Sequence, residues 1–242
     1  MTLQSFTIEA NEYLQQNIQA YYRCDYIKYK QPNNPDYLVT LKNTFKNLSE
    51  SQLKSAVNQL ASTLTDEVLE ILSLSKQQSI AICVVPRAKS LDSYAPSQLL
   101  FRLTIQHIIL KLQQHYPNII DGTNYIVRHT DTRTTHLPND AGNGSDPYPG
   151  ITKNTCTLSP EIKGKNILLI DDIYTKTINV DEDAIQALLD CGAQNVTFFA
   201  IARTVYKGYA TYQANESNSD INPLDKQYNQ YCLQLLREFL NK

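Results

Sequence analysis

Residues 165–193 read KNILLIDDIYTKTINVDEDAIQALLDCGA, and this stretch decides the fold. Its predominantly apolar run, residues 166–170, has the composition of a buried strand and stops at two adjacent carboxylates, Asp171 and Asp172. A short threonine-rich loop follows, and an amphipathic helix then covers residues 180–190 and ends before Gly192. The stretch therefore predicts a strand, a charged turn and a helix N-terminus in direct succession.

The junction between this strand and this helix combines groups that bind phosphate with groups that bind hydroxyls or a metal. The first turn of a helix offers unpaired backbone N–H groups and the positive end of the helix dipole, and both favour a phosphate group. Two carboxylates just before it suit ribose hydroxyls or a metal-bound pyrophosphate. The combination indicates a phosphorylated sugar as the ligand.

The segment 168–179, LLIDDIYTKTIN, resembles the 5-phosphoribosyl-1-pyrophosphate (PRPP) motif of type I phosphoribosyltransferases. In that motif a hydrophobic strand leads into two acids, and a Thr/Ser/Gly phosphate loop follows. The looser resemblance covers roughly residues 80–203 and is nearest to the amidophosphoribosyltransferase-like and ComF-like proteins of bacteria. The positions that match the motif are Asp171, Asp172, Ile173 and Thr175, and Asn179 stands where the family usually has Thr or Ser.

The resemblance implies roles for these and other residues. Asp171 and Asp172 would hold the ribose hydroxyls, directly or through Mg²⁺, and would favour an oxocarbenium-like centre. The strand 80–85 ends in a short loop of the kind with which the family binds pyrophosphate; the alternative is two solvated charges in a turn. The implied 5-phosphate contacts are Tyr174, Thr175, Lys176, Thr177, Ile178 and Asn179, and the implied pyrophosphate contacts are Arg87, Ala88, Lys89 and Arg128.

Two weaker assignments come from the loops. Residues 129–160 show no periodicity, and within them the segment 129–150 fits the catalytic loop that closes over PRPP in the family. This segment supplies Arg133 as a catalytic candidate beside His129 and His136. Arg203 and Tyr206 follow the last expected strand and are candidates for the contact with the acceptor. Ordinary roles at a strand end are the alternative for both.

One position departs from the family pattern. Thr177 stands where the phosphate loop usually has glycine. Glycine permits a positive φ and a close approach of the backbone, whereas a β-branched residue resists both. Either the turn has a different shape here, or the phosphate site is weaker.

Composition limits the classes of function. The 242 residues carry 22 basic and 24 acidic side chains, so the net charge of −2 provides no general attraction to nucleic acid or membrane. Five scattered cysteines without a C-x-x-C pair indicate reduced thiols, and the first residues do not resemble a secretion signal. We therefore expect a cytoplasmic protein that binds neither membrane nor nucleic acid directly.

The expected organisation is α/β, with a parallel sheet of the type I phosphoribosyltransferase fold. Residues 1–76 are expected to form a helical N-terminal hood, because Phe6, Ala10, Tyr13, Leu14 and Ile18 recur at helical spacing and Ser49 with Gln52 resembles a capping box. The core would follow over residues 77–206, with strands at 80–85, 125–127, 166–170 and 196–201 and helices at 97–115 and 180–190. A polar loop and a C-terminal helix at 224–240 would complete the chain in residues 207–242.

The leading hypothesis is a phosphoribosyltransferase that uses PRPP, Mg²⁺ and a small-molecule nitrogen acceptor, and the family analogy implies a homodimer. A PRPP or nucleotide sensor without turnover is the second hypothesis, because Thr177 departs from the motif. An accessory of DNA uptake or defence, by resemblance to ComF-like proteins, is the third.

Overall fold

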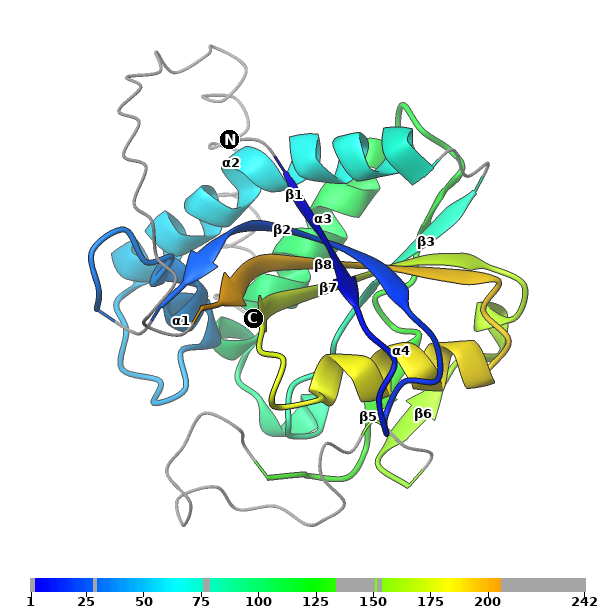
Figure 1. The fold of residues 1–242 in the computed structure, drawn as a ribbon. Helices are drawn as coiled ribbons and strands as arrows, with labels where there is room; N and C mark the ends of the chain where they lie inside the picture. Colours follow the sequence, from blue (N-terminus) through cyan, green and yellow to red (C-terminus); the bar gives the residue numbers. More distant parts are fainter. Residues whose placement is uncertain (1–2, 28–29, 76–78, 134–150, 152–153, 206–242) are drawn as a thin grey trace.

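The computed structural model describes residues 3–27, 30–75, 79–133, 151 and 154–205, and these build an α/β fold (Figure 1). Its central sheet has six strands in the order β1-β2-β8-β7-β3-β4. The five strands from β2 to β4 in this order are parallel, and β1 runs antiparallel at one edge. The six strands are β1 (Gln4–Ile8), β2 (Ile18–Tyr26), β3 (Ile80–Val84), β4 (Ile119–Asp121), β7 (Asn166–Tyr174) and β8 (Asn195–Thr204).

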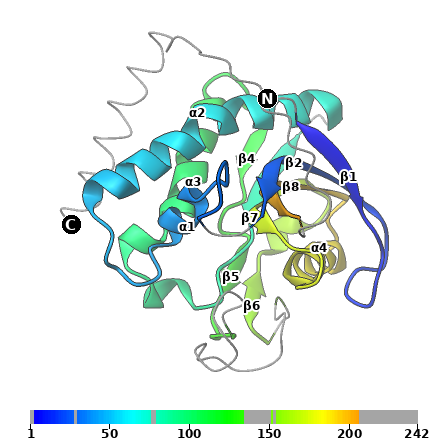
Figure 2. The ribbon, with the colours of Figure 1, turned by 60° about the vertical axis from the view of Figure 1, so that its left-hand side comes forward.

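Helices cover both faces of this sheet. The helices α1 (Tyr37–Lys42), α2 (Glu50–Ser75) and α3 (Leu100–Gln113) lie on one side, and α4 (Val180–Asp190) lies on the other (Figure 2). On the α4 side, the chain also forms a separate antiparallel pair, β5 (Ile126–Arg128) with β6 (Cys156–Leu158). Short 3₁₀ turns at Leu91–Ser93, Pro96–Gln98 and Pro160–Ile162 connect these elements.

A hydrophobic core lies on each face of the sheet, because the central strands are apolar on both faces. In β3, Ile80, Ile82 and Val84 pack toward the three-helix side, whereas Ala81 and Cys83 pack toward α4. The same division holds along β7 and β8. This pattern explains why the sequence of each central strand is a continuous apolar run rather than an alternating one.

The direction of winding reverses between β3 and β7. From β3 the chain passes through α3 to β4 on one side, and from β7 it passes through α4 to β8 on the other. Ligands of open α/β sheets bind at such a reversal, beyond the carboxyl ends of the strands. The two strand ends are in register here, since Val84 pairs with Ile170 and the Val85 amide donates to the Ile170 carbonyl at 3.0 Å.

Several sequence predictions are confirmed. Strands lie at 80–84, 166–174 and 195–204, and helices lie at 100–113 and 180–190, as the apolar patterns indicated. The capping box is also present, because the Ser49 amide donates to Gln52 Oε1 at 2.9 Å and the Gln52 amide to Ser49 Oγ at 3.3 Å. The expected C-terminal helix at 224–240 lies outside the described residues.

The helical N-terminal hood is wrong for Gln4–Tyr26, which forms β1 and β2 of the central sheet. The apolar residues of this region match a helical spacing by coincidence, because they are distributed over two strands and the hairpin loop between them. Within β2 the real period is two: Ile18 and Ala20 are buried while Gln19 between them is exposed. The helical part of the prediction holds only for α1 and α2.

Other boundaries also differ from expectation. The strand expected at 125–127 belongs to the small β5–β6 sheet, and the three-residue strands β4 and β6 were not predicted, since they are too short to show a period. Most important, β7 does not stop before the two acids but continues through Asp171 and Asp172 to Tyr174. Both carboxylates therefore sit on a strand paired with β8, not in a loop.

Candidate functional site

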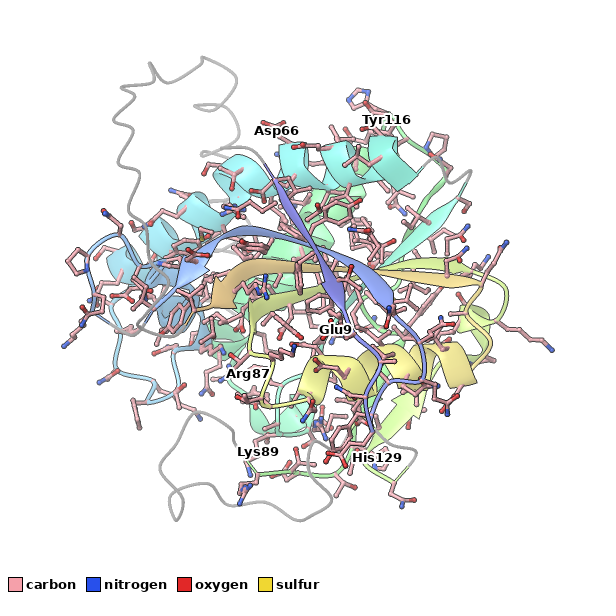
Figure 3. All side chains as sticks on the ribbon, in the orientation of Figure 1. Glu9, Asp66, Arg87, Lys89, Tyr116 and His129 are labelled. Atoms are coloured by element: carbon pink, nitrogen blue, oxygen red, sulfur yellow. The ribbon has the colours of Figure 1, made fainter. Side chains whose placement is uncertain are left out.

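The candidate site lies at the carboxyl ends of β3 and β7, where residues 86–89 leave one strand and residues 174–179 leave the other. Figure 3 labels Arg87 and Lys89 on this side of the molecule. The α1 helix ends nearby on one face of the sheet, and α4 begins on the other face (Figure 1). The two segments that the family resemblance connects are thus brought to adjacent strands.

Asp172 forms an ion pair that sequence reasoning missed. Lys42 Nζ, from the last residue of α1, lies 2.8 Å from Asp172 Oδ2, and the two side chains are only 13% and 12% exposed. No local pattern connects a lysine in the first helix with the acid of a distant strand. The pair forms only in the folded protein, where the end of α1 lies beside the C-terminal end of β7.

Asp171 faces a different partner, the carboxyl group of Asp181 in the first turn of α4. The two side chains are hydrogen-bonded, and Asp181 is 4% exposed. Burial, and then the charge of Asp172, raise the pKa of Asp171 to about 7. Burial and the neighbouring Asp171 raise the pKa of Asp181 well above its usual value, so at neutral pH Asp181 carries the proton and donates it to Asp171.

The other acids of the first helical turn are also engaged. Glu182 is 1% exposed, and its Oε1 accepts a hydrogen bond of 2.7 Å from the hydroxyl of Tyr174. Asp183 Oδ2 accepts from the Ile151 amide at 2.6 Å. Negative charge in the first turn of a helix interacts favourably with the helix dipole. The sequence did not show that Asp181 and Glu182 are buried, with Asp181 Oδ1 and Glu182 Oε2 lacking a hydrogen-bond partner.

The loop 174–179, which the sequence analysis matched to a phosphate loop, lacks the usual glycine and adopts the left-handed conformation at another position. The left-handed residue of this loop is Asn179, with φ 58° and ψ 15°, and not Thr177. Asparagine tolerates this conformation far better than a β-branched residue does. The turn closes through a bond from the Ile178 amide to the Thr175 carbonyl at 3.0 Å, and the Thr175 hydroxyl lies 2.6 Å from that of Thr204. The loop therefore has a different shape from the glycine-containing motif.

The hairpin loop between β1 and β2 reaches this phosphate loop, which the sequence did not indicate. Two of its residues contact this loop, and a third contacts α4. The contacts join Glu9 Oε2 to Lys176 Nζ (3.2 Å), Asn11 Nδ2 to Asn179 Oδ1 (3.2 Å) and the Gln15 amide to Gln186 Oε1 (2.9 Å).

The contact of Asn11 fixes the orientation of the Asn179 amide. Asn11 Oδ1 accepts from the backbone amides of Tyr13 (2.8 Å) and Leu14 (3.1 Å), so its NH₂ group must be the donor toward Asn179. Asn179 accepts with its oxygen and presents its own NH₂ group elsewhere. The Asn179 side chain makes no capping hydrogen bond to the first turn of α4.

Arg87, in the segment 86–89 that follows β3, is held by contacts within the protein. Its Nη1 donates to the carbonyls of Lys42 (2.9 Å) and Gln98 (2.5 Å), and its guanidinium lies 4.3 Å from the centre of the Tyr94 ring. Burial lowers the pKa of Arg87, and the charges of Tyr94 and Asp172 oppose that shift. Arg87 is therefore close to the acid pair, but part of its hydrogen-bonding capacity fixes α1 against β3.

The rest of this segment is tied to the chain that follows β5. The Ala88 carbonyl accepts from the Thr132 amide at 2.7 Å, and Lys89 Nζ lies 3.3 Å from the Thr132 carbonyl. Arg128 is 3% exposed, and its Nε donates to the Arg87 carbonyl at 2.7 Å. The buried Arg128 side chain thus holds the backbone of residues 86–89 in place.

The remaining candidates are more peripheral. Arg133 and His129 are exposed and stand where the chain enters residues 134–150. Arg203 packs 4.5 Å above the Phe6 ring, against the N-terminal strands. His136 and Tyr206 lie outside the described residues.

Magnesium is the cofactor that the family resemblance implies. Carboxylates are suitable ligands, and magnesium commonly takes only one or two from a protein while substrate phosphates and water supply the rest. Asp171 and Asp172 fit that limited role. Within the described ranges, no cluster of three or more His, Cys, Asp or Glu side chains is arranged to hold a metal.

No protein-family model matches this chain, and no curated protein matches it. In the part of the chain that the structure describes, no helix combines the length and apolar character needed to cross a membrane. The sheet topology and the site geometry therefore carry the functional argument.

Proposed function

We propose that the protein binds PRPP together with Mg²⁺ and transfers its phosphoribosyl group to a nitrogen acceptor, with release of pyrophosphate. The observation that carries this proposal is the adjacency of two motif segments. Residues 86–89 and 171–179 leave neighbouring parallel strands at the point where the sheet reverses its winding. This is the position at which an α/β sheet binds a ligand.

Each part of the ligand has a suitable set of groups. The 5-phosphate lies at the phosphate loop and the N-terminus of α4, where backbone N–H groups and the Asn179 NH₂ donate to it. Asp171 and Asp172 accept hydrogen bonds from the ribose hydroxyls. The pyrophosphate lies beside residues 86–89. Protonation of Asp181 reduces the negative charge that the first turn of α4 would otherwise present to the phosphate.

The reaction is a dissociative displacement at C1 of the ribose. The bond from C1 to the pyrophosphate oxygen breaks, its electron pair leaves with pyrophosphate, and the acceptor nitrogen forms the new bond to C1 and loses a proton. The carboxylates of Asp171 and Asp172 stabilise the positive charge that develops on the ring. Magnesium, when bound with PRPP, neutralises charge on the leaving group, and Asp171 and Asp172 are the residues that would hold it.

The test is pyrophosphate release from PRPP in the presence of a panel of nitrogen acceptors: nucleobases, ammonia and small amines. Release that depends on both an acceptor and Mg²⁺ would support transfer. Tight binding of PRPP with no release under any of these conditions would contradict it.

A sensor without turnover is the second candidate, and one observation favours it. Both carboxylates already have partners in this structure, Lys42 for Asp172 and Asp181 for Asp171. A protein that only reports PRPP could use the loss of these contacts as its signal. The sensor predicts binding without pyrophosphate release, so the same assay separates the two functions.

A further inference from the structure

Lys42 lies at the end of α1, where several hydrogen bonds fix the backbone. Its carbonyl accepts a hydrogen bond of 2.9 Å from Arg87 Nη1. The next residue, Asn43, is 3% exposed and adopts the left-handed conformation with φ 37°, and its Nδ2 donates to Ser97 Oγ at 3.1 Å. The end of α1 is thus fixed from two sides, which places the Lys42 ammonium at the acid pair.

The ammonium of Lys42 interacts with more than one carboxyl group. Its ammonium lies 2.8 Å from Asp172 and also acts electrostatically on Asp171, whose pKa it lowers against the larger effect of burial. Arg87 is the other nearby cation, but its Nη1 donates to two backbone carbonyls. An ammonium carries three donors on a flexible stem, so Lys42 can keep a contact to Asp172 and still reach an oxygen of a ligand.

We propose that Lys42 is a ligand-binding residue of this site, which neutralises Asp172 when the site is empty and contacts the diphosphate of PRPP when ribose hydroxyls engage Asp172. This inference rests on the proposed function and assigns a residue that the motif does not contain. Lys42 then has two effects of opposite sign. It attracts the diphosphate, and it competes with the ribose hydroxyls for the carboxylate.

The opposite signs make the proposal testable with three probes: PRPP, inorganic pyrophosphate and ribose 5-phosphate. In Lys42→Met, we expect the affinity for PRPP and pyrophosphate to fall about tenfold or more, because a charge-assisted contact is lost. The affinity for ribose 5-phosphate, which has no diphosphate, should stay the same or rise. Lys42→Arg should retain most of the diphosphate affinity.

The matched control is Lys54→Met. Lys54 also pairs with an acid, Glu50, but within the N-terminal turns of α2. This variant should bind all three probes as the wild type does. Since Lys42→Met leaves Asp172 without a cation, the double variant Lys42→Met with Asp172→Asn provides a second test in which no unpaired carboxylate remains. It should still bind pyrophosphate poorly.

The outcomes are distinct. An equal loss of affinity for all three probes would mean that Lys42 acts only on the structure, and unchanged pyrophosphate binding would exclude the contact; each overturns the proposal. Pyrophosphate binding that depends on Lys42, in a wild type that does not bind PRPP, would uphold Lys42 while the proposed function fails. A wild type that binds none of the probes overturns both.

Discussion

In the described part of the chain, the buried acids Glu67 and Asp172 each pair with a cation, and the two pairs are held very differently. Glu67 on α2 receives both Nε and Nη2 of Arg23 from β2, and Arg23 Nη1 also donates to the Tyr37 hydroxyl at 2.7 Å. Asp172 pairs through one oxygen, Oδ2, with Lys42, and its neighbour Asp171 faces another acid. The two pairs are similarly buried, with side chains 8–13% exposed.

We interpret the Arg23–Glu67 pair as structural and the Lys42–Asp172 pair as part of the proposed binding site. A planar guanidinium that matches both oxygens of a carboxylate fixes two layers of the fold and leaves little for a ligand. The Lys42 ammonium contacts one carboxylate and acts on a second, so the negative charge is only partly neutralised, as is typical of functional sites. Variants at the two places should therefore behave in opposite ways.

The largest effect is expected at the structural pair. Arg23→Met leaves Glu67 buried without its cation, and we expect a loss of about 3–5 kcal/mol in the free energy of unfolding. Urea denaturation measures it. Replacing both members, as Arg23→Met with Glu67→Leu, should recover much of the loss, whereas PRPP binding should not distinguish the folded variants. A loss below 1 kcal/mol would make this pair no stronger than a surface one.

The second effect is a pH dependence at the acid pair. The folded state holds the pKa of Asp171 at about 7 against an ordinary value of 3.8, so it binds more protons than the unfolded chain between these values. Stability from this group is thus complete below about pH 4 and is lost as the pH rises toward 7, at up to about 1.4 kcal/mol per pH unit.

Asp181→Asn tests the proton on Asp181. An asparagine NH₂ still donates to Asp171 but does not titrate, so the variant no longer loses the stability that the wild type loses when the unfolded chain ionises Asp181 and the folded state keeps it protonated. We expect the stability of the variant relative to the wild type to increase from pH 4 to pH 7, as measured by urea midpoints at several pH values. A constant difference over this range would show that the two acids do not share a proton.

A smaller effect is expected at Asn179. Asn179→Thr forces a β-branched residue into the left-handed region and should cost about 1–2 kcal/mol, whereas Asn179→Gly should be close to neutral for stability. Thermal unfolding compares the two. Both variants should bind ribose 5-phosphate more weakly, because each removes the NH₂ donor. Equal stability of the two variants would argue against a left-handed residue 179.

The smallest effect is expected at the exposed contact between Lys176 and Glu9, whose side chains are 68% and 70% exposed. Glu9→Gln should change stability by no more than about 0.5 kcal/mol, since a solvated ion pair contributes little. The same thermal unfolding experiment serves here. A larger loss would mean that the hairpin loop holds the phosphate loop in place more firmly than these contacts suggest.

The sequence predicted the parts of the molecule whose signal is local. An apolar run followed by two acids was enough to locate β7, and the spacing within 180–190 was enough to locate α4. The N-terminal strands were missed because five apolar residues of a hairpin happen to match a helical period. The strand was predicted to end at the acids because charged residues are uncommon in a central strand, yet β7 continues through them where it leaves the core.

The partners of the site residues could not be predicted in the same way. Lys42, Asn11 and Arg23 meet their partners only through the return of distant segments to one edge or face of the sheet. The sequence likewise identified Thr177 as a departure from the motif, but it could not show that the left-handed conformation had moved to Asn179. Long-range packing decides such contacts, and a single sequence carries no local sign of it.

The most direct test of the central claim is calorimetric titration of the protein with PRPP, with and without Mg²⁺, beside the double variant Asp171→Asn with Asp172→Asn. We predict magnesium-dependent binding by the wild type, in the micromolar range, and a loss of affinity of about tenfold or more in the variant. Wild-type protein that does not bind PRPP, or a variant that binds it equally well, would contradict the assignment of this site.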